Sequence, residues 1–164
     1  MYFNVQRMFP CLMVNSIPQK RKKANAFQKE GLIMQKKYVC AAVIRRNGYT
    51  MICSRPKATV LRDKMEFPGG KVEPGESYHE CIVRELREEL GAEVLPLDIV
   101  HEVEHEYPNG LLDIVFIRCI LKPGSNPLPR EGQEMKWVPT AELGSVDFLE
   151  ADQPFAELIA EAAR

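Results

Sequence analysis

A glycine-containing loop that leads directly into an acidic helix restricts most what this chain can fold into. The loop is Gly70–Glu76, and Arg84–Ala92 follows it within a predicted helix. Glu85, Glu88 and Glu89 are separated by steps of three and four residues, so a helix places their carboxylates on one face. Like charges at these spacings repel one another, whereas a hard divalent cation prefers carboxylate oxygens as ligands. The segment therefore predicts a metal site.

The spacing of this segment is more specific than its charge. For Glu88 and Glu89 alone, a solvated acidic helix is the alternative, because glutamate-rich helical faces are common. The whole string, preceded by Phe67–Gly70, resembles the Nudix box, and only its final position differs, where Ala92 replaces the usual Val, Ile or Leu. The matching residues are Gly70, Glu76, Arg84, Glu85, Glu88, Glu89 and Gly91.

The resemblance covers about residues 38–162 and is to MutT-type Nudix hydrolases. It implies an α/β fold, the Nudix α/β/α sandwich with a mixed β-sheet between helices. It also implies that Glu85 is the general base and a metal ligand, and that Arg84 orients the neighbouring carboxylates. Further metal ligands are implied in the same way: the backbone carbonyl of Gly69 and the side chains of Glu88, Glu89 and Glu131. Glu76 is implied to have a supporting role.

The substrate-binding residues are also expectations from the resemblance. Arg55 matches an arginine that contacts substrate phosphate, with a plain surface charge as the alternative. Phe67 matches a position that lines the nucleobase pocket, and Asp152 stands where 8-oxoguanine-specific relatives carry asparagine. An ionised aspartate only accepts hydrogen bonds, which suits the exocyclic amino groups of cytosine or adenine. A protonated aspartate could instead donate to an oxidised purine.

Charge distribution limits the partners of this chain of 164 residues. Residues 1–37 hold eight basic residues and one acidic residue, a net charge of +7, which leaves 14 basic and 22 acidic residues in 38–164, a net charge of −8. An acidic domain is a poor match for a nucleic-acid polymer, which requires a basic surface. A small nucleoside triphosphate remains compatible if metal ions supply the positive charge.

The N-terminal segment 1–35 lacks sustained periodicity and carries the basic run Lys20–Lys23. It is interpreted as a disordered basic extension, a targeting peptide or sequence upstream of the true start, and residues 36–164 as the Nudix domain. No apolar run approaches the roughly 20 residues that span a bilayer. The five cysteines lack CxxC pairs, so most are expected to be core residues in a reducing, cytoplasmic protein.

The remaining pattern predicts a β-rich sheet with two helices. Strands are expected at residues 38–45, 49–54, 99–107, 111–121 and 136–139, with Asn47-Gly48 as a hairpin turn. Helices are expected at 76–90 and 154–163, the first with His79, Val83, Leu86 and Leu90 toward the core. His101 and His105 share a face of a strand and are expected to be solvent-facing or structural.

Metal chemistry then predicts the reaction. Mg²⁺ suits an all-oxygen site, neutralises phosphate oxygens and lowers the pKa of bound water, and Mn²⁺ should substitute for it. The resemblance implies the activity of a MutT-type pyrophosphohydrolase, similar to 8-oxo-dGTP diphosphatases or CTP pyrophosphohydrolases, which releases pyrophosphate and a nucleoside monophosphate from a canonical, oxidised or modified triphosphate. A non-catalytic nucleotide sensor and a hydrolase of dinucleoside polyphosphates or nucleotide sugars are the alternatives. The protein is expected to be a monomer or homodimer.

Overall fold

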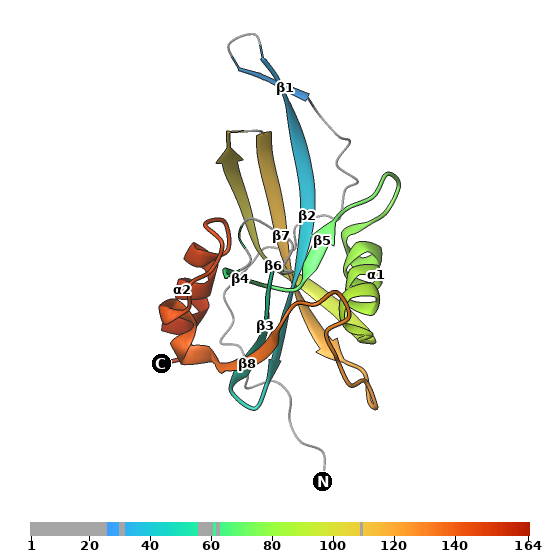
Figure 1. Cartoon of the computed structure of the whole chain (residues 1–164), viewed down its shortest axis with the longest axis vertical. Helices are drawn as coiled ribbons and strands as arrows, with labels where there is room; N and C mark the ends of the chain where they lie inside the picture. The colour runs from blue at the N-terminus through green and yellow to red at the C-terminus, as the bar shows by residue number, and fades with distance from the viewer. Residues whose placement is uncertain (1–25, 30–31, 56–60, 62, 109) are drawn as a thin grey trace.

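A mixed β-sheet lies at the centre of the molecule, with one helix on each side (Figure 1). The structure is a computed structural model that describes residues 26–29, 32–55, 61, 63–108 and 110–164. The sheet order is β4-β3-β2-β7-β6, while β1 and β5 pair with β2, and β8 pairs with β3. The strands are β1 (Ala26–Lys29), β2 (Leu32–Arg46), β3 (Tyr49–Ser54), β4 (Met65–Glu66), β5 (Gly69–Lys71), β6 (Val94–Tyr107), β7 (Gly110–Leu121) and β8 (Met135–Pro139). The helices are α1 (Tyr78–Leu90), the 3₁₀ helix η2 (Thr140–Ser145) and α2 (Gln153–Glu161).

The two faces of the sheet carry separate cores, which confirms the expected α/β/α sandwich. Strand β2 is paired in parallel with β7 and is apolar throughout its buried part, as expected for a strand covered on both faces. Successive side chains of a strand point to opposite faces. Accordingly, Cys40 and Ala42 belong to the core beneath α1, whereas Ala41 and Val43 belong to the core that includes Phe155 of α2.

The hairpin between β2 and β3 follows the prediction. Asn47 and Gly48 both have positive φ angles, 53° and 82°, as the two central residues of a type I′ turn require. Strand β3 has the predicted bounds of residues 49–54.

Helix α1 begins at Tyr78, two residues after the predicted start. The hydroxyl of Ser77 accepts a hydrogen bond from the Glu80 N–H, and the Glu80 carboxylate accepts one from the Ser77 N–H. This capping box fixes the first turn. The helix ends at Gly91, which adopts the left-handed conformation with a φ of 60°.

The core face of α1 is broader than predicted. Leu86 and Leu90 are buried and Val83 packs against the core as expected, but His79 is only half-buried, and Cys81 and Ile82 are buried as well. The covered side follows the apolar residues of the helix, and the polar His79 is not fully covered. The four described cysteines behave as the predicted small core residues: Cys40, Cys53, Cys81 and Cys119 are all buried.

Several other elements extend beyond their predicted bounds. Strand β6 begins at Val94, and its register with β7 shifts between Pro96, Ile99 and His101. Residues 26–29 and 32–35 pair with each other as β1 and the start of β2, ahead of the expected boundary at residue 36. The rest of the predicted extension, residues 1–25 and 30–31, lies outside the described residues. Within the described part of the chain, no helix is both long and apolar enough to cross a membrane.

Candidate active site

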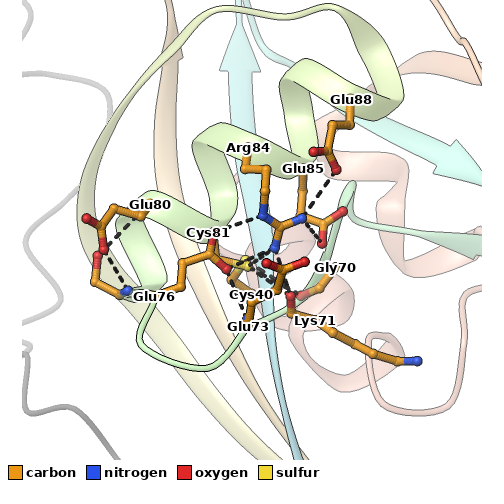
Figure 2. Close-up of polar contacts among 11 residues, drawn as sticks. Cys40, Gly70, Lys71, Glu73, Glu76, Glu80, Cys81, Arg84, Glu85 and Glu88 are labelled. Carbon is orange, nitrogen blue, oxygen red and sulfur yellow. Dashed lines mark hydrogen bonds and ion pairs between the residues drawn. The ribbon is translucent and has the colours of Figure 1, made fainter.

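Arg84 lies at the centre of the polar contacts between the glycine loop and α1 (Figure 2). Its Nε and Nη2 donate to the two carboxylate oxygens of Glu76, at 2.8 and 2.9 Å. Its Nη1 donates to Glu85, at 2.9 Å, and to Glu88, at 3.3 Å. Nη2 also donates to the backbone carbonyl of Lys71, at 3.0 Å. One guanidinium therefore connects the loop to two carboxylates of the helix.

These contacts set the ionisation of the surrounding groups. The hydrogen bonds from Arg84 hold the pKa of Glu76 below its ordinary value, and in return they raise the pKa of Arg84 above its usual range. Burial raises the pKa of Glu85, and the hydrogen bond from Arg84 opposes that increase. Arg84 thus stabilises the ionised forms of Glu76 and Glu85.

Glu89 lies where several acidic side chains converge. Burial raises the pKa of Glu89 to about 8, and the charges of Glu85, Glu66 and Glu131 add to the effect, while a backbone hydrogen bond with Gly69 opposes it. A carboxylate in this position is costly without a positive charge close by. Glu89 is therefore affected by expected ligands from three parts of the chain: Glu85 on the same helix, Gly69 before the loop and the distant Glu131.

The donor chemistry fits a hard divalent cation, although the side chains are not arranged as a closed ligand cage. Among the described residues, no group of three or more His, Cys, Asp or Glu side chains stands ready to hold an ion. Glu85 and Glu88 are instead engaged by Arg84. The expected donors are all oxygens, the set that Mg²⁺ and related ions prefer.

Gly70 makes room for the carboxylate of Glu85. A Cβ atom at residue 70 would lie 2.3 Å from the Glu85 carboxyl carbon, closer than real Cβ contacts allow. Gly70 is held in place by pairing with Cys40 of β2. The glycine therefore lets the loop pass directly against the acidic helix.

Glu131 is exposed, on a loop that packs against the C-terminal end of α1. The backbone N–H of Arg130 donates to the carbonyl of Glu89, at 2.9 Å, and the N–H of Leu128 donates to that of Leu90, at 2.8 Å. Residues about 40 positions apart in the sequence are thus brought together.

Arg55 lies just after β3 and contacts Glu66 of β4, with its Nη1 3.2 Å from Glu66 Oε2. Burial raises the pKa of Glu66, and the charge and hydrogen bond of Arg55 oppose this. Glu66 was not predicted from the sequence as a site residue. Its position directly before Phe67 was the signal that could have indicated it. It acts electrostatically on both Glu89 and Asp152, between the acidic helix and the expected base pocket.

Phe67 and Asp152 lie together, but the ring of Phe67 is part of the core. The ring is stacked on Phe148 with centroids 5.3 Å apart and makes an edge contact with Phe116 at 5.5 Å, and only 3% of the residue is exposed. Its backbone N–H donates a long hydrogen bond to Asp152, at 3.4 Å. Asp152 is 5% exposed, and burial raises its pKa to about 7.

The two histidines of β6 have structural contacts. His101 is stacked on Phe155, with ring centroids 4.8 Å apart, and burial lowers its pKa. His105 lies 3.5 Å from a carboxylate oxygen of Glu150. The structural interpretation of His101 is confirmed.

The fold and the site together define an α/β/α protein whose acidic loop–helix segment, anchored by one arginine, is the candidate catalytic centre. The chain belongs to the Nudix family, because the family model described as the NUDIX domain matches residues 34–161. It is a Nudix hydrolase of the MutT-like group.

Two relatives and one solved structure show what the chain is similar to. The 8-oxo-dGTP diphosphatase of Escherichia coli K12 is 30% identical over 122 residues, which cover 74% of this chain and 94% of the relative. The CTP pyrophosphohydrolase of the same strain is 40% identical over 76 residues, which cover 46% of this chain and 56% of the relative. The solution structure of the E. coli ORF135 protein has 32% identity and a TM-score of 0.67, and covers 80% of this chain and 94% of the relative.

Proposed function

We propose that this protein is a Mg²⁺-dependent nucleoside triphosphate pyrophosphohydrolase of MutT type, in which Mn²⁺ can substitute. The observation that carries the proposal is the contact set of Arg84 with Glu76, Glu85 and Glu88, one helical turn from the partly buried Glu89. The 8-oxo-dGTP diphosphatase and CTP pyrophosphohydrolase relatives support the same reaction class.

The proposed reaction is attack of water on the β-phosphorus of the triphosphate. The P–O bond to the α–β bridging oxygen breaks, and the products are pyrophosphate and a nucleoside monophosphate. Glu85 accepts the proton from water as general base. Glu88, Glu89, Glu131 and the Gly69 carbonyl would hold the cation, which would supply charge neutralisation and a lowered pKa of bound water.

Arg84 and Arg55 have separate proposed roles. Arg84 keeps Glu85 ionised and oriented through its 2.9 Å hydrogen bond. Arg55 binds a phosphate oxygen of the substrate, and in doing so it gives up its hydrogen bond to Glu66. A phosphate is a stronger partner than one partly exposed carboxylate, because it offers more anionic oxygens to the guanidinium fork.

The nucleobase is proposed to be selected at Asp152. As an ionised group, Asp152 accepts from an exocyclic amino group; with a pKa of about 7, a substantial fraction also carries a proton that it can donate. This dual capacity fits both a cytosine and an oxidised purine. We therefore propose a (d)NTP substrate that is canonical, oxidised or modified, and a role in cleaning the cytoplasmic nucleotide pool, as a monomer or homodimer that does not bind nucleic-acid polymers.

The proposal is tested by measuring pyrophosphate release from a panel of canonical and oxidised triphosphates with Mg²⁺, Mn²⁺ or EDTA. We expect release with either ion, loss of release with EDTA, and a stoichiometric nucleoside monophosphate product. Nucleotide binding without any release would instead support a sensor. Turnover confined to dinucleoside polyphosphates or nucleotide sugars would also overturn the proposal.

A further inference from the structure

One buried amide side chain connects the two segments that carry the proposed metal ligands. Gln133 is only 7% exposed. Its Nε2 donates to the backbone carbonyl of Glu89 in α1, at 3.1 Å. Its Oε1 accepts from the backbone N–H of Glu131, at 2.8 Å. The same side chain thus holds the backbone of one ligand residue on the helix and one on the loop.

The end of α1 offers carbonyl acceptors for this loop. Arg130 contacts the same end, with its Nη1 3.2 Å from the carbonyl of Arg87, which also accepts from the Gly91 N–H. The guanidinium of Arg130 lies over Gly91, where a Cβ atom would come within 2.2 Å of it. The left-handed glycine that ends the helix is therefore also the surface on which the loop packs.

We infer that Gln133 is a positioning residue for the metal site, which fixes the separation of Glu89 and Glu131 without binding the ion itself. The inference rests on the proposed function for the identity of these two ligands. A glutamine amide suits this task because it carries a donor and an acceptor at one end of a single side chain. Removing it takes the Gln133 acceptor away from the Glu131 N–H and leaves the Glu89 carbonyl with the Arg130 N–H as its donor, which loosens the link between helix and loop.

The magnitude follows from the behaviour of groups that orient metal ligands. Loss of such a group typically weakens metal binding by about 10–100-fold. We expect Gln133→Met, which keeps the volume and removes both hydrogen bonds, to weaken Mn²⁺ binding by about 10-fold or more. Gln133→Asn has a shorter side chain that cannot reach both the Glu89 carbonyl and the Glu131 N–H, so it should also weaken Mn²⁺ binding. It replaces the methionine variant in the experiment if that variant folds poorly.

Thr140→Val is the matched control. The hydroxyl groups of Thr50 and Thr140 form a buried hydrogen bond of 2.9 Å between β3 and η2. This variant removes one buried hydrogen bond of the scaffold while it leaves the contacts of Glu89 and Glu131 in place. It should bind Mn²⁺ with the affinity of the parent protein.

The experiment is a titration of the full chain with Mn²⁺ alone, in which electron paramagnetic resonance measures the free ion, alongside the metal dependence of pyrophosphate release. Weaker binding in both Gln133 variants, with a parallel rise in the metal concentration needed for release, supports the inference. Folded Gln133 variants with parental affinity overturn it, as does an equal loss in Thr140→Val. A parent that binds Mn²⁺ tightly but releases no pyrophosphate refutes the proposed function alone, since the shift in binding still tests Gln133.

Discussion

Replacing Arg84 by methionine tests whether its contacts hold the loop and the helix together. The substitution removes the hydrogen bonds to Glu76 and Glu85 while an unbranched apolar chain fills most of the space. The side chains of Glu76 and Glu85 are 13% and 14% exposed, so both carboxylates would be left largely buried and without their cation.

The expected cost can be worked from this burial. Removing one partner of a buried ion pair typically destabilises a protein by about 3–5 kcal/mol. The side chain of Arg84 is 24% exposed, so water compensates in part, and we expect a loss near the lower end, about 3 kcal/mol. With a urea m-value of about 2 kcal/mol/M, this loss lowers the unfolding midpoint by about 1.5 M.

Arg87→Met is the control, because Arg87 lies on the same helix and has two hydrogen bonds to Glu93. That pair is solvent-exposed, with side chains 57% and 44% accessible, and exposed ion pairs stabilise little. Urea unfolding of both variants in EDTA, followed by circular dichroism, measures the difference. Equal midpoints for the two variants would refute the reasoning from burial.

The same comparison has a pH signature. Arg84 holds the pKa of Glu76 below its ordinary value of 4.5 in the folded protein. A depressed folded pKa contributes stability that is complete above the unfolded pKa and is lost as pH falls through the folded value. The stability difference between the parent and Arg84→Met should therefore be full at pH 7 and shrink below about pH 4.5.

Three further substitutions test the proposed catalytic and binding residues. Glu85→Gln should retain the fold and reduce turnover by about 10²–10⁴-fold, and near-normal pyrophosphate release would remove Glu85 from its role. Gly70→Ala should lower turnover with little change in melting temperature. The new Cβ would lie 2.3 Å from the Glu85 carboxyl carbon, so the end of this flexible side chain would have to move. Gly144→Ala is the control, because its new Cβ would make only ordinary contacts, the nearest at 3.7 Å. Asp152→Asn should shift the ratio of turnover on 8-oxo-dGTP to that on CTP toward 8-oxo-dGTP, while the exposed Asp147→Asn should leave it unchanged.

Local signals in the sequence were sufficient for the elements that local interactions decide. The turn at Asn47-Gly48 requires positive φ angles, and this requirement placed β3 correctly. The Ser77-x-x-Glu80 capping box was equally visible and would have placed the start of α1. The buried face of α1 was predicted in part: Leu86 and Leu90 are buried, but the apolar Cys81 and Ile82 are buried as well, while the polar His79 is not fully covered.

The candidate site was only partly accessible from the sequence for a related reason. The spacing within Gly70–Gly91 implied a carboxylate cluster, and the structure has Arg84 in contact with two of its members. The link from Gln133 to Glu89 spans 44 positions, and no local pattern encodes it. The ring of Phe67 is another case, since the aromatic residues that enclose it come from distant elements.

The segment from Glu66 to Lys71 connects the chemistry proposed on the two faces of the sheet (Figure 1). On one side, Gly70 approaches Glu85 of α1, and on the other, the Phe67 N–H contacts Asp152 at the start of α2. The buried face of the acidic helix packs in one core, whereas Ala151 and Phe155, on either side of Asp152 in the sequence, belong to the other. Under the proposed function, a substitution at Asp152 changes which nucleotide is bound without touching the contacts of Arg84. The base preference could then vary independently of the acidic helix, and the names of two relatives do refer to different nucleobases, 8-oxoguanine and cytosine.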